Sequence, residues 1–108
     1  MFDQVADLMT TAELIERKLE EAFLPYFVKV TDESSLHAGH AGVKKEGGGH
    51  FAVKIVTSFF EGKTTLQRHQ AVYKTLAEEF GQTKIHALIL QTYSEEEWTS
   101  SPQISSLD

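Results

Sequence analysis

The chain has 108 residues, a length that suits one globular domain. Its 10 Lys and Arg stand against 16 Asp and Glu, which gives a formal net charge of −6. It contains five histidines and no cysteine, so disulfides, thiolate-only metal sites and cysteine nucleophiles are excluded. The acidic balance disfavours broad binding to a phosphate backbone, and no apolar run approaches the ~20 residues of a membrane span.

The first residues, Met1 to Gln4, carry neither the basic nor the apolar segment of a secretory signal. We therefore expect a cytoplasmic protein, or one of the mitochondrial matrix if the source is eukaryotic, because a cleaved presequence leaves no trace. Residues 1–10 are expected to form an N-terminal extension ahead of the folded domain.

The first predicted element is a helix from about Thr11 to Phe23. Thr10 and Glu13 have the spacing of a capping box, and apolar residues then recur at helical steps. Pro25 ends the helix, because the residue before a proline is pushed out of the α region.

Two strands are predicted next, separated by a long glycine-rich connection. Residues 27–31 and 50–56 are rich in β-branched and aromatic side chains, which is typical of strands. Hairpin loops mostly have two to five residues, so the connection 32–49 is either functional or disordered. It contains His37 and His40.

Apolar residues after the second strand recur at steps of three and four, which predicts one helix over residues 66–80. Gly81 is in position to end this helix as a C-cap. The predicted stripe along it consists of Leu66, His69, Tyr73, Leu76 and Phe80.

Residues 85–93 form a mostly apolar run, typical of a strand that is buried on both faces. The intervening helix implies a parallel, right-handed crossover to this strand. Ser94 then caps a short helix near Trp98, and residues 99–108 are expected to be a flexible tail. The order predicts an α+β sandwich over residues 11–98, α-β-β-α-β-α, with a three-stranded mixed sheet and helices on one face.

The histidines are the candidate metal ligands of a chain without thiols. His37 and His40, three residues apart on a glycine-rich segment, can converge on zinc, copper or iron. The alternative is a solvent-exposed loop that binds nothing, since metal motifs usually need more ligands. A lone histidine near the start of an apolar strand, such as His86, is more often a core residue than a metal ligand. No hydrolase or metalloprotease motif is present, so we expect a protein that is not an enzyme.

DNA binding through the helix 66–80 is the alternative of a different class. Such a helix could present side chains that read bases, but Glu78 and Glu79 on the same helix and the net charge oppose binding. The candidate partner or nucleic-acid face consists of Lys63, Arg68, His69 and Lys74.

Seven segments, taken in chain order, carry a resemblance to a known family: Thr31–His40, Gly49–Lys54, Phe60–Lys63, Leu66–Tyr73, Leu76–Glu79, Ile85–Leu88 and Trp98. With them, residues from about 11 to 98 resemble BolA-like proteins. One departure is visible, because the family's central motif commonly reads Arg-His-Arg and Gln70 replaces the second arginine. This removes a cation from the proposed nucleic-acid face.

The resemblance implies a class II KH-like fold and partnership with a monothiol glutaredoxin, sharing a glutathione-dependent [2Fe–2S] cluster. The ligands that it implies are His86 and His37, with His40 as the alternative loop ligand, and no cofactor is expected in the isolated chain. Because this chain has no cysteine, glutaredoxin and glutathione would supply the thiolates. A homodimer without the cluster, a stress or morphology factor without a cluster, and a DNA-binding regulator of the same type remain alternatives.

Overall fold

The protein is described from a computed structural model over residues 8–34 and 49–100. Within this part of the chain, no helix is long and apolar enough to cross a membrane. The elements are α2 (Thr11–Phe23), β1 (Phe27–Asp32), β2 (His50–Val56), the short 3-10 helix η3 (Ser58–Phe60), α3 (Thr65–Thr75), α4 (Ala77–Gly81), β3 (Ala87–Tyr93) and α5 (Glu95–Ser100).

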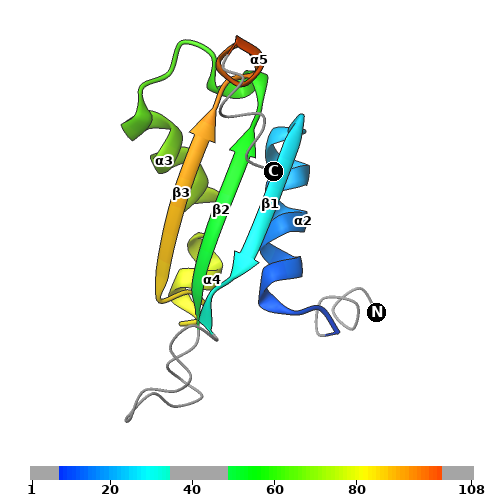
Figure 1. Ribbon diagram of the computed structural model, residues 1–108. Coiled ribbons are helices and arrows are strands. Elements are labelled where there is room, and N and C mark those ends of the chain that lie inside the picture. The colour runs from blue at the N-terminus through cyan, green and yellow to red at the C-terminus, as the bar shows by residue number, and fades with distance from the viewer. Residues whose placement is uncertain (1–7, 35–48, 101–108) are drawn as a thin grey trace.

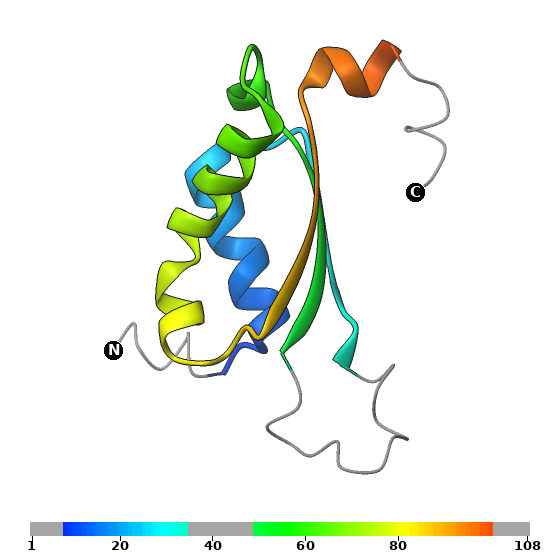
Figure 2. The ribbon, with the colours of Figure 1, turned by 90° about the vertical axis from the view of Figure 1, so that its left-hand side faces the viewer.

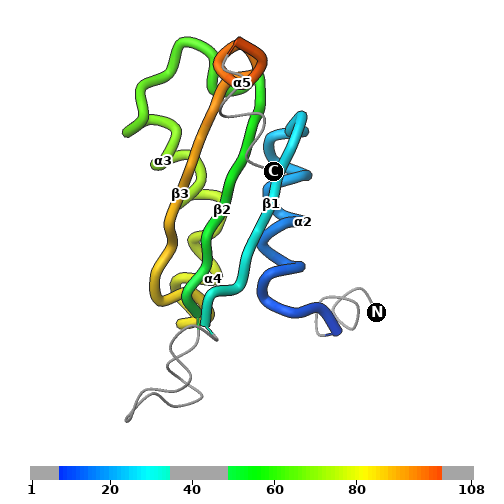
Figure 3. The backbone as a smooth tube through the Cα atoms, viewed as in Figure 1, coloured from blue at the N-terminus to red at the C-terminus, as the bar shows by residue number. Residues whose placement is uncertain are grey.

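The predicted α+β fold with a three-stranded mixed sheet is confirmed. The strand order is β1-β2-β3, with β1 antiparallel and β3 parallel to β2 (Figure 1). The backbone runs from β2 through α3 and α4 back to the start of β3 (Figure 3). Helices α2, α3 and α4 cover one face of the sheet, whereas α5 lies at one end on the opposite side (Figure 2).

Helix α2 has the predicted bounds because both of its ends are set by local interactions. The Thr10 hydroxyl accepts a hydrogen bond from the Glu13 N–H at 3.1 Å, and the Glu13 carboxylate accepts one from the Thr10 N–H at 2.9 Å. At the other end Leu24 adopts a left-handed conformation, φ 46°, just before Pro25. The sequence predicted both ends, from the capping box and from the proline.

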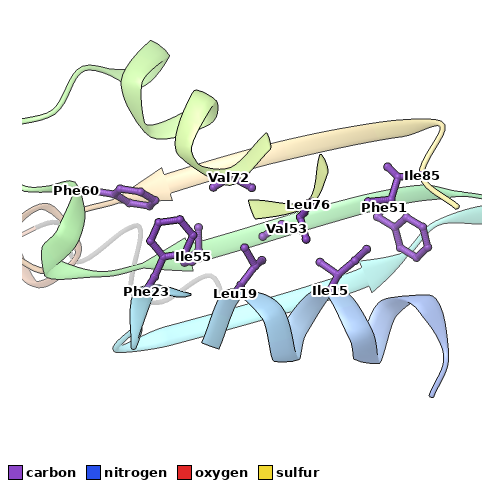
Figure 4. Close-up of a cluster of buried hydrophobic side chains, with 10 residues drawn as sticks. All are labelled: Ile15, Leu19, Phe23, Phe51, Val53, Ile55, Phe60, Val72, Leu76 and Ile85. Atoms are coloured by element: carbon purple, nitrogen blue, oxygen red, sulfur yellow. The ribbon is translucent and has the colours of Figure 1, made fainter. Parts of the chain in front are cut away.

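The core lies between the sheet and the three helices on its covered face. Alternate residues of β2 point into it and meet one side of α2 (Figure 4). The buried cluster consists of Ile15, Leu19, Phe23, Phe51, Val53, Ile55, Phe60, Val72, Leu76 and Ile85.

The prediction of one helix over 66–80 with an apolar stripe is wrong in two respects. The chain breaks at Leu76 into α3 and α4, and the side chains of Leu66 and Tyr73 are 65% and 42% exposed. Gly81 is the last helical residue rather than the C-cap. The buried side is offset from the expected stripe and consists of Arg68, Val72, Leu76 and Glu79.

The third strand also differs from its prediction, since it begins at Ala87 and is buried on one face only. Leu88 and Leu90 pack against the core, whereas Ile89 is 59% exposed. The physical reason is that α2, α3 and α4 all lie on one side of the sheet, and among the described elements only α5, at one end, lies on the other side (Figure 2).

A partly buried ion pair joins α2 to α4. The Lys18 ammonium lies 2.5 Å from a carboxylate oxygen of Glu79 and 2.9 Å from one of Glu78. Burial alone would lower the pKa of Lys18, but the hydrogen bonds and charges of Glu79 and Glu78 outweigh it and raise this pKa. The side chain of Glu79 is only 2% exposed, so Lys18 compensates a carboxylate inside the protein.

Candidate functional site

The candidate site lies at the end of the sheet where β1 ends and β2 and β3 begin (Figure 1). His50, the first residue of β2, is paired with Ala87, the first residue of β3. His86 therefore lies directly beside the point where the chain enters β2. Ser34 and Gly49, the described residues on either side of segment 35–48, lie at this same end.

The Ser34 hydroxyl holds the two sides of this end together. It accepts hydrogen bonds from the N–H groups of Gly49 at 2.9 Å and His50 at 3.3 Å. Ser34 is itself positioned by Asp32, whose carboxylate accepts a hydrogen bond from the Ser34 N–H at 2.9 Å. The described residues on the two sides of segment 35–48 are thus joined by one hydrogen-bonded cluster.

Gly49 links this cluster to His86. Its carbonyl accepts hydrogen bonds from the N–H groups of His86 at 2.8 Å and Ala87 at 3.1 Å. Its φ is +93°, and a Cβ at this position would lie 2.9 Å from the Lys84 carbonyl oxygen and 3.0 Å from Cδ2 of His86. Only a glycine fits this backbone conformation and close approach.

The imidazole of His86 is exposed, so the interpretation of a core histidine is wrong. Its ring makes no hydrogen bond or ion pair with the residues that the structure describes. Residues 8–34 and 49–100 contain no group of three or more His, Cys, Asp or Glu arranged to hold a metal ion. His37 and His40 lie outside the described residues, so their part in a metal site stays a prediction.

Arg68 was predicted on an exposed partner or nucleic-acid face, and the structure instead buries it to 7% exposure. Its guanidinium donates to the carbonyl oxygens of Lys63 at 2.9 Å and Thr92 at 3.2 Å. It also donates to both carboxylate oxygens of Glu97, at 2.7 and 3.1 Å. Arg68 therefore joins α3 to β3 and α5, and its charge is already paired.

The other residues predicted for this face remain accessible to different degrees. Lys74 is exposed, and Lys63 is half-buried with its ammonium 4.5 Å from the centre of the Phe59 ring. His69 is half-buried. Because Arg68 is buried, the accessible cations of this face are Lys63 and Lys74, which is little charge for contact with phosphates.

Because Arg68 binds Glu97, the stability of the protein should depend on this carboxyl group in acid. Hydrogen bonds from Arg68, and then from the Ser94 backbone, hold the pKa of Glu97 below its ordinary value of 4.5. The contribution of the Arg68–Glu97 interaction to stability is complete above the ordinary pKa of the carboxyl group. It is lost as the pH falls through the lower pKa that Glu97 has in the folded state. We expect the stability advantage of the wild type over Glu97→Gln to narrow between pH 5 and 3, as measured by urea unfolding.

The effect should be modest, because the Glu97 side chain is 48% exposed and solvent screens the ion pair. A wild type and a Glu97→Gln variant with parallel pH profiles over this range would contradict the assignment.

The sequence interpretation missed Ser34 and Gly49. Two local signals pointed to them: Asp32 stands two residues before Ser34, the spacing of an Asx-turn, and a glycine directly before a strand often marks close backbone approach. The hydrogen bonds between positions 34 and 49 depend on pairing of β1 with β2 and carry no local signature.

Comparison with known proteins places the chain in a family. Residues 19–97 match the family model described as BolA-like protein. The chain is 46% identical over 90 residues to the "DNA-binding transcriptional regulator BolA" of Escherichia coli (strain K12), covering 83% of this chain and 81% of that protein. It is 40% identical over 90 residues to human "BolA-like protein 1", covering 83% and 62% respectively.

Solved structures agree with these sequence matches. BolA1 from Arabidopsis thaliana superposes with a TM-score of 0.72 and 36% identity, covering 88% of this chain and 99% of that one. The BolA domain of SufE1 from the same plant gives a TM-score of 0.69 and 33% identity, covering 83% and 98%. With a family model over most of its length and relatives of this similarity, the chain belongs to the BolA family.

Proposed function

We propose that this protein is a non-enzymatic adaptor that binds a monothiol glutaredoxin and shares a glutathione-dependent [2Fe–2S] cluster with it. The role would be iron–sulfur cluster maturation and trafficking, or iron-redox signalling. The observation that supports the proposal is the exposed imidazole of His86, held against Gly49 at the end of the sheet from which segment 35–48 departs.

The donor set of the chain is compatible with a shared cluster and not with one held alone. The chain has no thiolate, and its described part offers one exposed imidazole at this end of the sheet. His86 would hold the cluster with His37, or with His40 in its place, and the partner and glutathione would supply thiolates. When bound, the cluster supplies reversible one-electron chemistry.

The resemblance implies His37 as the second ligand and leaves His40 as the alternative. The two histidines stand three and six positions after Ser34 in the sequence. Only neutral imidazoles bind iron, so the shared site should loosen as pH falls.

The proposal predicts that His86→Ala abolishes the spectral response to the cluster. Mixing the wild type with cluster-loaded monothiol glutaredoxin should change the visible circular dichroism, because an imidazole ligand from His86 would alter the electronic transitions of the cluster. His86→Ala should leave the spectrum of the loaded glutaredoxin unchanged. His69→Ala, a histidine change on α3, should give the wild-type spectrum at saturation.

An unaltered response in His86→Ala would refute the ligand assignment, and no response in the wild type would refute the adaptor function. His37→Ala and His40→Ala, measured separately, decide which of the two loop histidines binds iron.

Binding to DNA is the second candidate function, favoured by the name of the Escherichia coli relative. It would use α3, where Lys63 and Lys74 are the accessible cations of the predicted face. A DNA-binding regulator predicts sequence-specific affinity that falls with salt. Binding that is absent at low salt, or indifferent to sequence, would exclude this function for the isolated protein.

A further inference from the structure

Strand β3 forms an uncharged edge of the sheet. The strand order β1-β2-β3 puts β1 and β3 at the two edges, and the outer edge of β3 faces the viewer in Figure 2. The edge strand β1 carries Lys29 and Asp32, whereas no residue of β3 from Ala87 to Tyr93 is charged. Charged side chains are a common means of keeping an exposed edge from pairing with another chain. Of the two described edges, that of β3 is therefore the one suited to further pairing.

Hydrogen bonds at the two ends of β3 show which of its residues direct their backbone groups toward β2. The Ala87 N–H donates to the Gly49 carbonyl at 3.1 Å. At the other end, the Tyr93 carbonyl accepts a hydrogen bond from the Thr57 N–H at 3.0 Å. Along a strand that is paired on one side, the backbone groups of alternate residues point to opposite sides. Positions 87, 89, 91 and 93 therefore point toward β2, and the residues between them point outward.

The outward residues are Leu88, Leu90 and Thr92. The Thr92 carbonyl already accepts a hydrogen bond from the Arg68 guanidinium at 3.2 Å, which confirms that this residue faces away from β2. The N–H and C=O groups of Leu88 and Leu90 remain at the edge. These groups can be satisfied by an added strand, because a strand presents donors and acceptors at the matching spacing.

The flank of α3 on this side of the molecule carries an exposed aromatic ring. Helix α3 is right-handed and runs back toward the start of β3, so residues that directly follow its buried ones turn toward the outer edge of β3 (Figure 3). Tyr73 follows the buried Val72 and is 42% exposed. On the strand itself, Ile89 is 59% exposed. A strand along this edge would cover Ile89 and lie beside the flank that carries Tyr73.

We propose that the outer edge of β3 pairs with the same edge of a second copy of this chain, in antiparallel orientation and centred on Ile89. A two-fold axis at Ile89 sets Leu88 opposite the partner's Leu90 and Leu90 opposite the partner's Leu88. Each of these pairs exchanges both of its backbone hydrogen bonds, so the outward groups of both leucines are satisfied. The interface is self-complementary, as a two-fold dimer requires.

The centre at Ile89 is favoured by the side chains as well as by the backbone. Ile89 then faces the partner's Ile89 across a pair without ladder hydrogen bonds, where side chains approach each other most closely. An axis at Leu90 would need the Thr92 carbonyl that Arg68 already occupies, and it would set Ile89 against a glutamine. The proposed dimer uses neither His86 nor a cluster, so it is independent of the proposed adaptor function.

Sedimentation velocity of the full chain, from low micromolar to submillimolar concentration, tests the association. The sedimentation coefficient of the wild type should rise with concentration from that of a monomer toward that of a dimer. Ile89→Lys sets two ammonium groups against each other at the axis and should weaken dimer formation at least about tenfold. Leu24→Lys is the matched control, because Leu24 is 83% exposed at the end of α2 and its change should leave the association as in the wild type.

A single introduced cysteine tests the register, since the chain has no cysteine of its own. Under a mild oxidant, Ile89→Cys should form a disulfide-linked dimer, because the two Cα atoms at the axis lie within disulfide range. Gln91→Cys is equally accessible on the same strand, but its two copies would lie about 13 Å apart and should not cross-link. A wild type that stays monomeric, an Ile89→Lys variant that associates like the wild type, or equal cross-linking at positions 89 and 91 would each overturn the proposal.

Discussion

Replacing Arg68 with alanine is expected to lower the free energy of unfolding by about 3 kcal/mol. The guanidinium is buried and satisfies the carbonyl oxygens of Lys63 and Thr92 as well as the Glu97 carboxylate. The truncation leaves the two carbonyls without this donor and opens space beside the Phe60 ring, whose centre is 5.7 Å from Cζ of Arg68. Urea unfolding at neutral pH measures the loss.

Arg17→Ala is the matched control. Arg17 forms an ion pair with Glu21 at 3.3 Å, but both side chains are more than half exposed, so its loss should cost within about 0.5 kcal/mol. Arg68→Lys keeps the charge without the forked geometry and should fall between the two. Equal losses at positions 17 and 68 would show that Arg68 is not a structural link.

Gly49→Ala is expected to cost about 2 to 3 kcal/mol, and also to disturb His86. Its φ of +93° is unfavourable for alanine, and the new methyl group would press on the Lys84 carbonyl and the His86 ring. Urea unfolding measures the cost. The imidazole resonances of His86, followed by NMR, report the displacement.

Gly62→Ala separates backbone strain from contact. Gly62 has φ +72°, but no atom lies within 4 Å of the position where its Cβ would be. This variant should cost about 1 kcal/mol and leave the His86 resonances in place. If both variants lower the free energy of unfolding equally and neither shifts the His86 resonances, the contact between Gly49 and His86 does not position the imidazole.

The sequence was a good guide where the deciding interactions are local. The bounds of α2 follow from Thr10, Glu13 and Pro25, all within or next to the helix, and the structure confirms them. The short helix α5 follows in the same way, because Ser94 and Glu97 cap its first turn. Capping geometry spans three residues, so its signature is complete in the sequence.

The sequence was a poor guide to the helix 66–80 and to β3. Periodicity placed Leu66 and Tyr73 inside and gave no reason to bury Arg68, because Thr92 and Glu97, which accept its hydrogen bonds, lie 24 and 29 residues further along the chain. The apolar run of β3 likewise did not show that only one of its faces would be covered, which leaves Ile89 exposed.

For the candidate site, residue types came from the sequence and proximity came from the fold. The absence of cysteine already required that thiolates for any cluster come from elsewhere, since composition does not depend on folding. The contact of His86 with Gly49 needed the sheet, because strand pairing joins residues far apart in the chain. Chemical capacity is therefore a property of the sequence, whereas burial and register are decided by tertiary packing.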